Sequence, residues 1–325
     1  MIRWGILGAA KFARVHMGPA IHAAEGARLV ALATRDAEKS NGFRAFCPDL
    51  HVHGSYDALL ADPGIDAVYI PLPNHLHLEW SLKAIAAGKH VLTEKPMVMQ
   101  AAEFDQLIAA RDASGLQVAE AYMIVHHPQW QKVRDLIDAG EIGRIDHVDT
   151  AFSYDNRADP GNIRNRPETG GGGIRDIGVY TYGSVRFAAR AEPVALEARL
   201  RLENGVDTWA QVTGEMAGPQ GRFTYSAITS MRLFPRQEVV FQGERGLIRV
   251  TAPFNAGLFG EAQVTLHRNP NHMELFRFPA LNHYVLQVEA FGRAIRDGGG
   301  YPCPLEFSKG TQQMIDQIFA VGRAI

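Results

Sequence analysis

The sequence predicts an α/β chain of two domains: a doubly wound parallel sheet, then an α/β region with a large, open, mostly antiparallel sheet. Short apolar runs alternate with helix-like segments as far as about residue 121. This pattern is typical of strand–helix–strand units with right-handed crossovers. From Val194 to Phe278, β-rich runs are separated by turn residues, with little helix between them, which indicates an antiparallel sheet. A length of 325 residues suits about two domains.

The strands of the first domain are predicted from short apolar runs bounded by turn residues. Asp66–Ile70 is an almost continuous apolar run, the pattern of a strand that is covered on both faces. The other predicted strands are Ile2–Leu7, Arg28–Thr34, His90–Thr93 and Gln117–Ala121.

The helices between these strands are predicted from their start and stop signals. Asn74 is a suitable N-cap, and Gly88 and Gly115 stand where a left-handed residue ends a helix. The predicted helices are Lys11–Ala24, Ala37–Phe46, Asn74–Ala87 and Ala101–Ser114.

The pattern changes after Met123, so we predict one domain over residues 1–123 and a second over residues 124–325. His127–Pro128 starts a helix that ends at Gly140, and Asp146–Ser153 is strand-like. Two helices close the chain, at about residues 282–296 and 308–324, and the last of them is a candidate to pack back on the first domain.

Composition excludes several classes of function. A formal net charge of −2 without a basic stripe argues against binding to nucleic acid or to an anionic membrane. We expect no signal segment, because the sequence enters a predicted strand at once, and it contains no apolar run of roughly 18 residues. The two cysteines, Cys47 and Cys303, are far apart and fit a reducing compartment. We therefore expect a soluble cytoplasmic protein.

A candidate phosphate loop lies between the first strand and the first helix. In GILGAAKFA the fingerprint positions are Gly8, Ala10 and Ala13. Gly8 permits the tight turn, Ala13 lets helix and strand pack, and the helix N-terminus attracts a pyrophosphate. The alternative is an ordinary strand–turn–helix packed with small residues. The predicted cofactor contacts in this loop are Gly8, Ala9, Ala10, Lys11 and Phe12.

The end of the second strand favours NADP over NAD. An acidic residue at this position would bind the ribose hydroxyl of NAD. Here Thr34 and Arg35 come first and Asp36 follows, and a hydroxyl with a guanidinium suits a 2′-phosphate. NAD remains the alternative, with Arg35 stacked on adenine and Asp36 on the ribose.

The loop IPLPNHLH follows the fourth strand, at the edge where ligands bind in such sheets. We expect its residues Pro71, Leu72, Asn74 and His77 to lie near the cofactor. Because no cysteine or carboxylate ligands accompany His75 and His77, we predict no metal site.

The segment TEKP ends the fifth strand at the same edge. A lysine held there, Lys95, can hydrogen-bond a substrate oxygen beside a nicotinamide and lower the pKa of a neighbouring acid. Pro96 fixes the turn, and Glu94 balances the charge. The alternative is a solvated ion pair at the end of a strand.

A second motif, GGGGIRDIGVY, brings Asp176 and Tyr180 onto one face of a helix. A phenol near an ammonium can act as an acid or base near neutral pH, and an aspartate can orient substrate hydroxyls. The alternative is a capping aspartate and a packed tyrosine.

These segments together resemble the glucose–fructose oxidoreductase, inositol dehydrogenase and rhizopine-catabolism (Gfo/Idh/MocA) family. WGILGAAKFA, IPLPNHLH, VLTEKP, NIRNRPETGGGGIRDIGVY and NHYVLQVEAFGRAI fall in the family's order over nearly the whole chain. The nearest subgroup is that of the NADP-preferring sugar and dihydrodiol dehydrogenases. The resemblance implies an N-terminal Rossmann domain for NADP or NAD. It also implies a C-terminal substrate domain whose sheet forms homodimers or homotetramers.

The resemblance also implies roles for particular residues. Lys95, Asp176 and Tyr180 correspond to the family's catalytic positions. Asn162 and Arg164 are candidates to line a sugar pocket or to stabilise its loop, and Tyr284 to flank the nicotinamide or to belong to the core.

Some residues depart from the family pattern. Ala10 replaces a glycine, and Ile124 and Val125 stand where the subgroup often has tyrosine and arginine. Arg175 adds a charge that either selects an acidic substrate or points to solvent.

We therefore expect an oxidoreductase that moves a hydride between nicotinamide and a hydroxyl or carbonyl carbon of a carbohydrate-like small molecule. Two alternatives stay open. One is a lyase or glycosidase that retains its nicotinamide, and the other is a nucleotide-binding regulator without chemistry.

Overall fold

In the computed structural model, which describes residues 1–325, the chain groups into two compact units. The first contains Met1–His126 and Asn282–Lys309, and the second contains His127–Leu281 and Gly310–Ile325. Asn282–Lys309 thus groups with the first unit although it follows the second unit in the chain. The limits 1–123 and 124–325 stay a prediction for the functional domains.

The first unit is built on a six-stranded parallel sheet of order β3-β2-β1-β4-β5-β6. β4 is buried along its whole length, as its apolar sequence predicts. The strands are β1 (Ile2–Leu7), β2 (Ala27–Ala33), β3 (His51–His53), β4 (Ala67–Ile70), β5 (His90–Glu94) and β6 (Val118–Ala121). The predicted doubly wound parallel sheet is confirmed.

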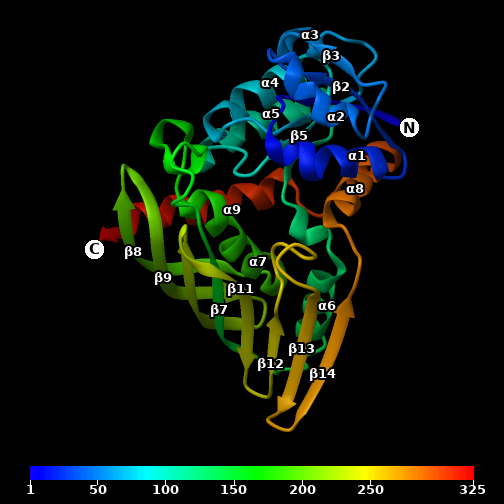
Figure 1. The fold of residues 1–325 in the computed structure, drawn as a ribbon. Coiled ribbons are helices and arrows are strands. Elements are labelled where there is room, and N and C mark those ends of the chain that lie inside the picture. Colours follow the sequence, from blue (N-terminus) through cyan, green and yellow to red (C-terminus); the bar gives the residue numbers. More distant parts are fainter. The chain divides into compact units, whose positions relative to one another are not determined.

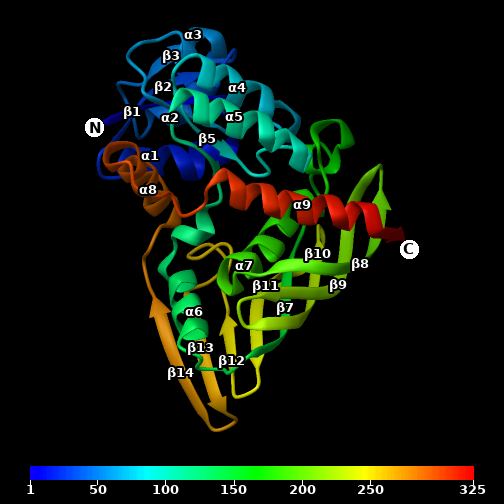
Figure 2. The same cartoon turned by 180° about the vertical axis from the view of Figure 1, so that it is seen from behind.

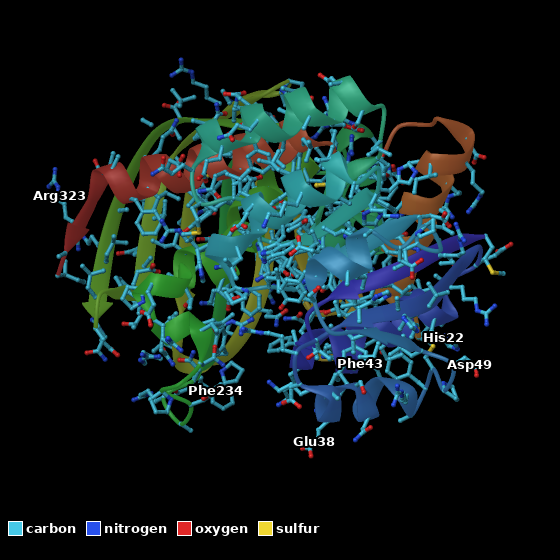
Figure 3. All side chains as sticks on the ribbon, turned by 90° about the horizontal axis from the view of Figure 1, so that it is seen from above. His22, Glu38, Phe43, Asp49, Phe234 and Arg323 are labelled. Carbon is cyan, nitrogen blue, oxygen red and sulfur yellow. The ribbon has the colours of Figure 1, made fainter.

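Helices cover both faces of this sheet (Figure 1 and Figure 2). α1 and α8 lie together on one face, and the rings of Trp4 in β1 and Phe291 in α8 are 5.2 Å apart. α4 and α5 lie together on the other face. The helices are α1 (Gly18–Ala23), α2 (Asn41–Arg44), α3 (Tyr56–Leu60), α4 (His77–Ala86), α5 (Phe104–Ser114) and α8 (His283–Asp297). Phe43 of α2, labelled in Figure 3, is fully buried.

The second unit is built on a nine-stranded sheet of order β14-β13-β12-β11-β7-β10-β9-β8-β15. β10 pairs with β7 and β15 with β8 in parallel, and the other pairs are antiparallel. The strands are β7 (Ile145–Asp155), β8 (Glu192–Glu203), β9 (Val206–Gly218), β10 (Gly221–Ser230), β11 (Arg232–Gly243), β12 (Leu247–Val250), β13 (Ala262–Asn269), β14 (His272–Phe278) and β15 (Gly322–Ala324). The predicted mostly antiparallel sheet is confirmed.

Two helices, α6 (Pro128–Asp138) and α7 (Val179–Ala189), pack against each other and against this sheet. α9 (Leu305–Val321) begins in the first unit and continues in the second. Buried and exposed residues alternate along β10, so one face of the sheet is packed and the other is more open. None of the helices is long and apolar enough to span a bilayer.

Several elements differ from the predictions. Neither β3 nor α3 is predicted. β3 has only three residues, two of them histidines, which is too short a run to show a period. The predicted helix Lys11–Ala24 contains a π-helical turn, Ala13–Met17, before α1. A second π turn, Ile174–Gly178, precedes α7.

Candidate functional site

The order of the first sheet brings four strand ends to one edge. β2 lies on one side of β1 and β4 on the other, so the strand order reverses at β1. In open α/β sheets, ligands bind outside the carboxyl ends of the strands at such a reversal. The loops after β1, β2, β4 and β5 carry the residues predicted to bind a cofactor.

Gly8 ends β1 and must be glycine for two reasons. Its φ is +102°, which side chains rarely adopt. A Cβ there would lie 2.9 Å from Leu72 Cδ2 and 3.3 Å from Tyr56 Oη. The Gly8 amide donates to the carbonyl of Ala33 at 2.9 Å, which ties the loop to the end of β2. This narrow turn leads into a helix that starts at Lys11, so its N-terminus suits a pyrophosphate.

The end of β2 leaves Arg35 exposed and engages Asp36 in its own turn. Asp36 Oδ1 accepts from the Glu38 amide at 3.1 Å, and its Oδ2 lies 3.8 Å from Lys39 Nζ. The Thr34 hydroxyl is within 3.2 Å of the Asp36 backbone. A carboxylate used as a helix cap is a poor ribose acceptor, whereas an exposed guanidinium suits a phosphate.

The loop after β4 is well ordered by its own packing. Pro71 and Leu72 are buried, and Asn74 starts a 3₁₀ turn that leads into α4. His77 is fully buried, with Nε2 2.7 Å from the Leu72 carbonyl and Nδ1 2.8 Å from the Pro96 carbonyl. Both ring nitrogens face protein oxygens, so neither is available to the cofactor. His77 instead supports the loop that is predicted to lie near the cofactor.

The turn that carries Lys95 is held by buried polar groups. Glu94 accepts hydrogen bonds from the Tyr69 hydroxyl at 2.5 Å and from the Lys95 amide at 3.3 Å. Glu120 on β6 accepts from the Met97 amide at 2.8 Å. Burial raises the pKa of Glu120. The backbone on both sides of the lysine is thus fixed.

Tyr284 joins the phosphate loop to α8 within the first unit. Its ring packs edge-to-face on Phe12, with the centroids 5.5 Å apart, and it also contacts His16 at 5.6 Å. Burial, and then the charge of Glu94, raise the pKa of its phenol. It is 5% exposed, so it packs as a core residue beside the loop that is predicted to bind the cofactor.

In the second unit, Asp176 is the centre of a charged cluster. Its Oδ2 accepts from the Tyr154 hydroxyl at 2.7 Å and lies 2.7 Å from Arg164 Nε. The charge of Asp176 raises the pKa of Arg164, and burial raises the pKa of Tyr154. Asp176 is therefore held in place as the partner of a cation and a phenol.

Tyr180 lies in α7 against two aromatic rings. The centroids of Phe152 and Phe254 are each 5.9 Å from its ring, and Tyr180 is 6% exposed. Arg164 interacts electrostatically with Tyr180 as well as with Asp176. The structure thus brings Arg164, Asp176 and Tyr180 together in the second unit.

The glycines that precede this cluster allow other parts of the chain to lie very close to their backbone. A Cβ on Gly171 would lie 2.5 Å from the Arg164 carbonyl, and Gly172, with φ of +112°, faces the Asp207 carboxylate. Asp207 Oδ2 accepts from the Ile174 amide at 2.6 Å. The buried carboxylate of β9 thus holds the turn that carries Asp176.

The remaining predicted residues have local partners. Asn162 Oδ1 accepts from the Arg164 amide at 3.1 Å, so its side chain stabilises its own loop. The Arg175 guanidinium lies 4.6 Å from the Phe319 ring, with Asp207 and Asp316 as nearby charges. Arg175 is therefore packed within the second unit and does not point freely to solvent. Ile124 and Val125 are buried.

Three contributors were missed at the sequence level: Tyr154, Glu120 and Asp207. Each meets its partner across a distance in the chain, for example 33 residues between Asp207 and Ile174. No motif marks them. A signal existed only in the unusual placement of Glu120 inside the apolar strand VAEA.

Comparison with known proteins identifies the family. The model described as "Oxidoreductase family, NAD-binding Rossmann fold" matches residues 2–122, and that of the GFO/IDH/MocA C-terminal domain matches residues 130–249. The chain belongs to the Gfo/Idh/MocA oxidoreductase family. It is an NAD(P)-dependent oxidoreductase, and the predicted class of cofactor is confirmed.

Several proteins that resemble the enzyme are named for sugar substrates. It is 34% identical to a dTDP-3,4-didehydro-2,6-dideoxy-α-D-glucose 3-reductase of Saccharopolyspora spinosa, over 99% of this chain and 97% of the other. It is 30% identical to an NADP⁺ D-xylose 1-dehydrogenase of Haloferax volcanii, over 97% and 96%. A 3-ketoreductase from Actinomadura kijaniata, solved with NADP and TDP-benzene, has a TM-score of 0.88 at 29% identity and covers 100% and 98%.

Asp207 makes the stability of this enzyme depend on pH. Burial raises its pKa from 3.8 to about 7, against the opposing effect of its amide partners. Between these values the folded chain keeps a proton that the unfolded chain releases, so the contribution of Asp207 to stability falls as pH rises. Relative to Asp207→Asn, we expect wild-type protein to lose about 1–3 kcal/mol of unfolding free energy between about pH 5 and about pH 8.

Urea unfolding of the two proteins across this range measures the difference. If the two pH profiles run parallel, Asp207 does not titrate in this window and its proposed protonation is wrong.

Proposed function

We propose that the enzyme is an NADP-preferring dehydrogenase or reductase of a sugar, polyol or related hydroxyl or carbonyl carbon. The observation that supports it is the shared sheet edge in the first unit, where a glycine turn, an exposed Arg35 and Lys95 follow β1, β2 and β5. The dinucleotide, when bound, supplies the hydride chemistry at its nicotinamide ring. Gly8, Ala9, Ala10, Lys11 and Phe12 would hold its pyrophosphate, and Thr34 and Arg35 its 2′-phosphate.

The other residues of this edge have proposed roles that follow from their positions. Pro71, Leu72 and Asn74 would border the ribose and nicotinamide, because they form the loop after β4. Glu94 would fix the lysine turn, and Tyr284 would support Phe12 from behind.

The proton transfer is assigned to residues of this chain. Tyr180 Oη exchanges a proton with the substrate oxygen, and Lys95 Nζ hydrogen-bonds that same oxygen. Arg164 lies close enough to Tyr180 for its charge to interact with the phenol. Asp176 holds Arg164 and Tyr154 and offers its carboxylate to substrate hydroxyls. Asn162 keeps the loop of Arg164 in shape at the substrate side.

An uncharged sugar is favoured over a nucleotide-linked sugar. Arg157, Arg164 and Arg166 in the segment after β7 are paired with carboxylates, and Arg175 packs on the Phe319 ring, so these guanidinium groups are already engaged within the protein. The pairs are Arg157–Asp155 at 2.6 Å, Arg164–Asp176 at 2.7 Å and Arg166–Glu168 at 2.7 Å.

Assembly and location extend the proposal. We propose a homodimer or homotetramer formed through the open sheet of the second unit. Phe234, labelled in Figure 3, is 88% exposed, and Leu202 and Met273 are each 56% exposed, and contact with a second copy would bury such side chains. Both cysteines are buried thiols outside any disulfide, which is compatible with a cytoplasmic enzyme.

Two alternative functions can be distinguished from this proposal by what happens to the cofactor. A lyase or glycosidase that retains its nicotinamide would turn over without net change in NADPH. A regulator would bind NADPH and turn over no sugar. Net NADPH formation or consumption at 340 nm, stoichiometric with product, distinguishes the proposed reaction from both.

Lys95→Met is expected to lower kcat by about 10²–10³-fold, because the substrate oxygen loses its charged partner. The NADPH dissociation constant, measured by fluorescence, should stay within about three-fold. Lys83→Met, at an exposed lysine paired with Glu79, is the matched control. Full turnover of Lys95→Met would remove this lysine from the mechanism.

Arg35→Ser is expected to weaken NADPH binding by about 10–100-fold, because one charge-assisted hydrogen bond to the 2′-phosphate is lost. NADH binding should not change, because NADH lacks that phosphate. Fluorescence titration with both cofactors measures this, with Arg44→Ser, an exposed arginine on α2, as control. Equal losses for both cofactors would contradict a 2′-phosphate contact.

A cofactor-coupled screen over aldoses, polyols, inositols and diols is expected to find an uncharged substrate. TDP added to this reaction should not compete with the sugar, because the loop arginines are already paired. Competition by TDP at micromolar concentration, or activity only with a nucleotide-linked ketosugar, would overturn the preference for an uncharged substrate.

A further inference from the structure

His77 joins two loops of the first unit that serve different parts of the proposed reaction. One partner is the carbonyl of Leu72, in the loop after β4, and the other is the carbonyl of Pro96, next to Lys95. The distances are 2.7 Å and 2.8 Å, and no part of the side chain is exposed. The ring therefore contacts no substrate or cofactor and acts only through its two neighbours.

We propose that His77 is a positioning residue that fixes Lys95 relative to the loop that borders the cofactor. The proposal rests on the proposed role of Lys95. It concerns a residue that neither touches the reacting atoms nor belongs to the lysine turn itself.

The chemistry of the ring supports this bridge. Burial lowers the pKa of His77 to about 4, while the two carbonyl oxygens favour the protonated ring. A neutral ring has one N–H, so it donates to one carbonyl and stays in close contact with the other. Whichever nitrogen carries the proton, the imidazole fills the space between the two loops. A smaller side chain would not reach both carbonyls, and an apolar one would offer no hydrogen-bond donor.

The other supports of the lysine turn come from within the sheet. Tyr69 on β4 holds Glu94, and Glu120 on β6 holds the amide of Met97. His77 starts α4 and is the contact that arrives from the cofactor loop. Loss of its ring would leave one buried carbonyl without its hydrogen-bond donor, would remove the contact with the other, and would uncouple the loop from the turn.

The test compares His77→Phe with His77→Gln, and uses His75→Phe as the matched control. His75 is exposed and lies two residues earlier. We expect His77→Phe to lower kcat by about ten-fold or more and to weaken NADPH binding, since both loops lose their common support. His77→Gln, whose amide can donate to one carbonyl as the neutral ring does, should stay within about three-fold of wild type. His75→Phe should match wild type.

Three measurements keep the outcome clear: kcat, the NADPH dissociation constant by fluorescence, and the free energy of unfolding in urea. A role confined to folding would lower the unfolding free energy of His77→Phe and leave kcat and NADPH affinity unchanged, and this result would overturn the proposal. Rescue by glutamine of kcat and affinity together would support it.

A double-mutant cycle with Lys95→Met decides whether His77 acts through the lysine. The double variant His77→Phe/Lys95→Met should turn over no more slowly than Lys95→Met alone, because the lysine is already gone. Multiplied losses would mean that His77 acts independently, against the proposal. If Lys95→Met itself keeps full turnover, the proposed function of Lys95 fails, and that failure appears in the single variant before the cycle is built.

Discussion

The reversal of strand order at β1 is the constraint from which the candidate cofactor edge of the first unit follows. Since β2 and β4 flank β1, the segments that leave these strands diverge and leave room above the sheet. That room is limited on both sides by side chains: Tyr56 follows β3 and Leu72 follows β4, and both approach Gly8. A residue with a side chain at position 8 would meet both of them, so the turn and its neighbours determine one another.

The cluster around Asp176 in the second unit depends on buried polar groups that satisfy one another. Asp207 accepts from the Ile174 amide and faces Gly172, and Asp176 binds Tyr154 and Arg164. Buried charges are tolerated only where such partners exist. The aromatic rings of Phe152 and Phe254 restrict Tyr180 from another side. Asp176 and Tyr180 are thus oriented by their protein partners before any ligand binds.

Local patterns in the sequence were enough to predict most of the fold. Apolar runs such as VYI predict buried strands, and Gly115 and Gly140 predict helix ends. Both glycines have positive φ in the structure, as a helix-ending glycine requires. Lys95, Asp176 and Tyr180 stand out because each belongs to a short segment with unusual residues at fixed spacing. The resemblance to a known family then supplied roles that no spacing contains.

What the sequence could not predict depends on partners far apart in the chain. Nothing near residue 207 shows that its carboxylate supports a turn at residue 174. His77 looked like a residue at the start of a helix beside the cofactor, and only the positions of two carbonyls reveal the bridge. The short β3 was missed because an edge strand of three residues has no period to detect.

The two π turns have a consequence for variation in chain length. Ala13–Met17 follows the glycine turn, and Ile174–Gly178 carries Asp176. A π turn closes its hydrogen bond over one residue more than an α-helix does. Removal of one residue from either turn would leave a regular α-helix whose flanking segments keep their orientation, while the side chains of the turn itself would point in other directions. Relatives shortened by a single codon here would fold and yet aim Asp176 elsewhere, so insertions and deletions at these two places should be far rarer than in surface loops.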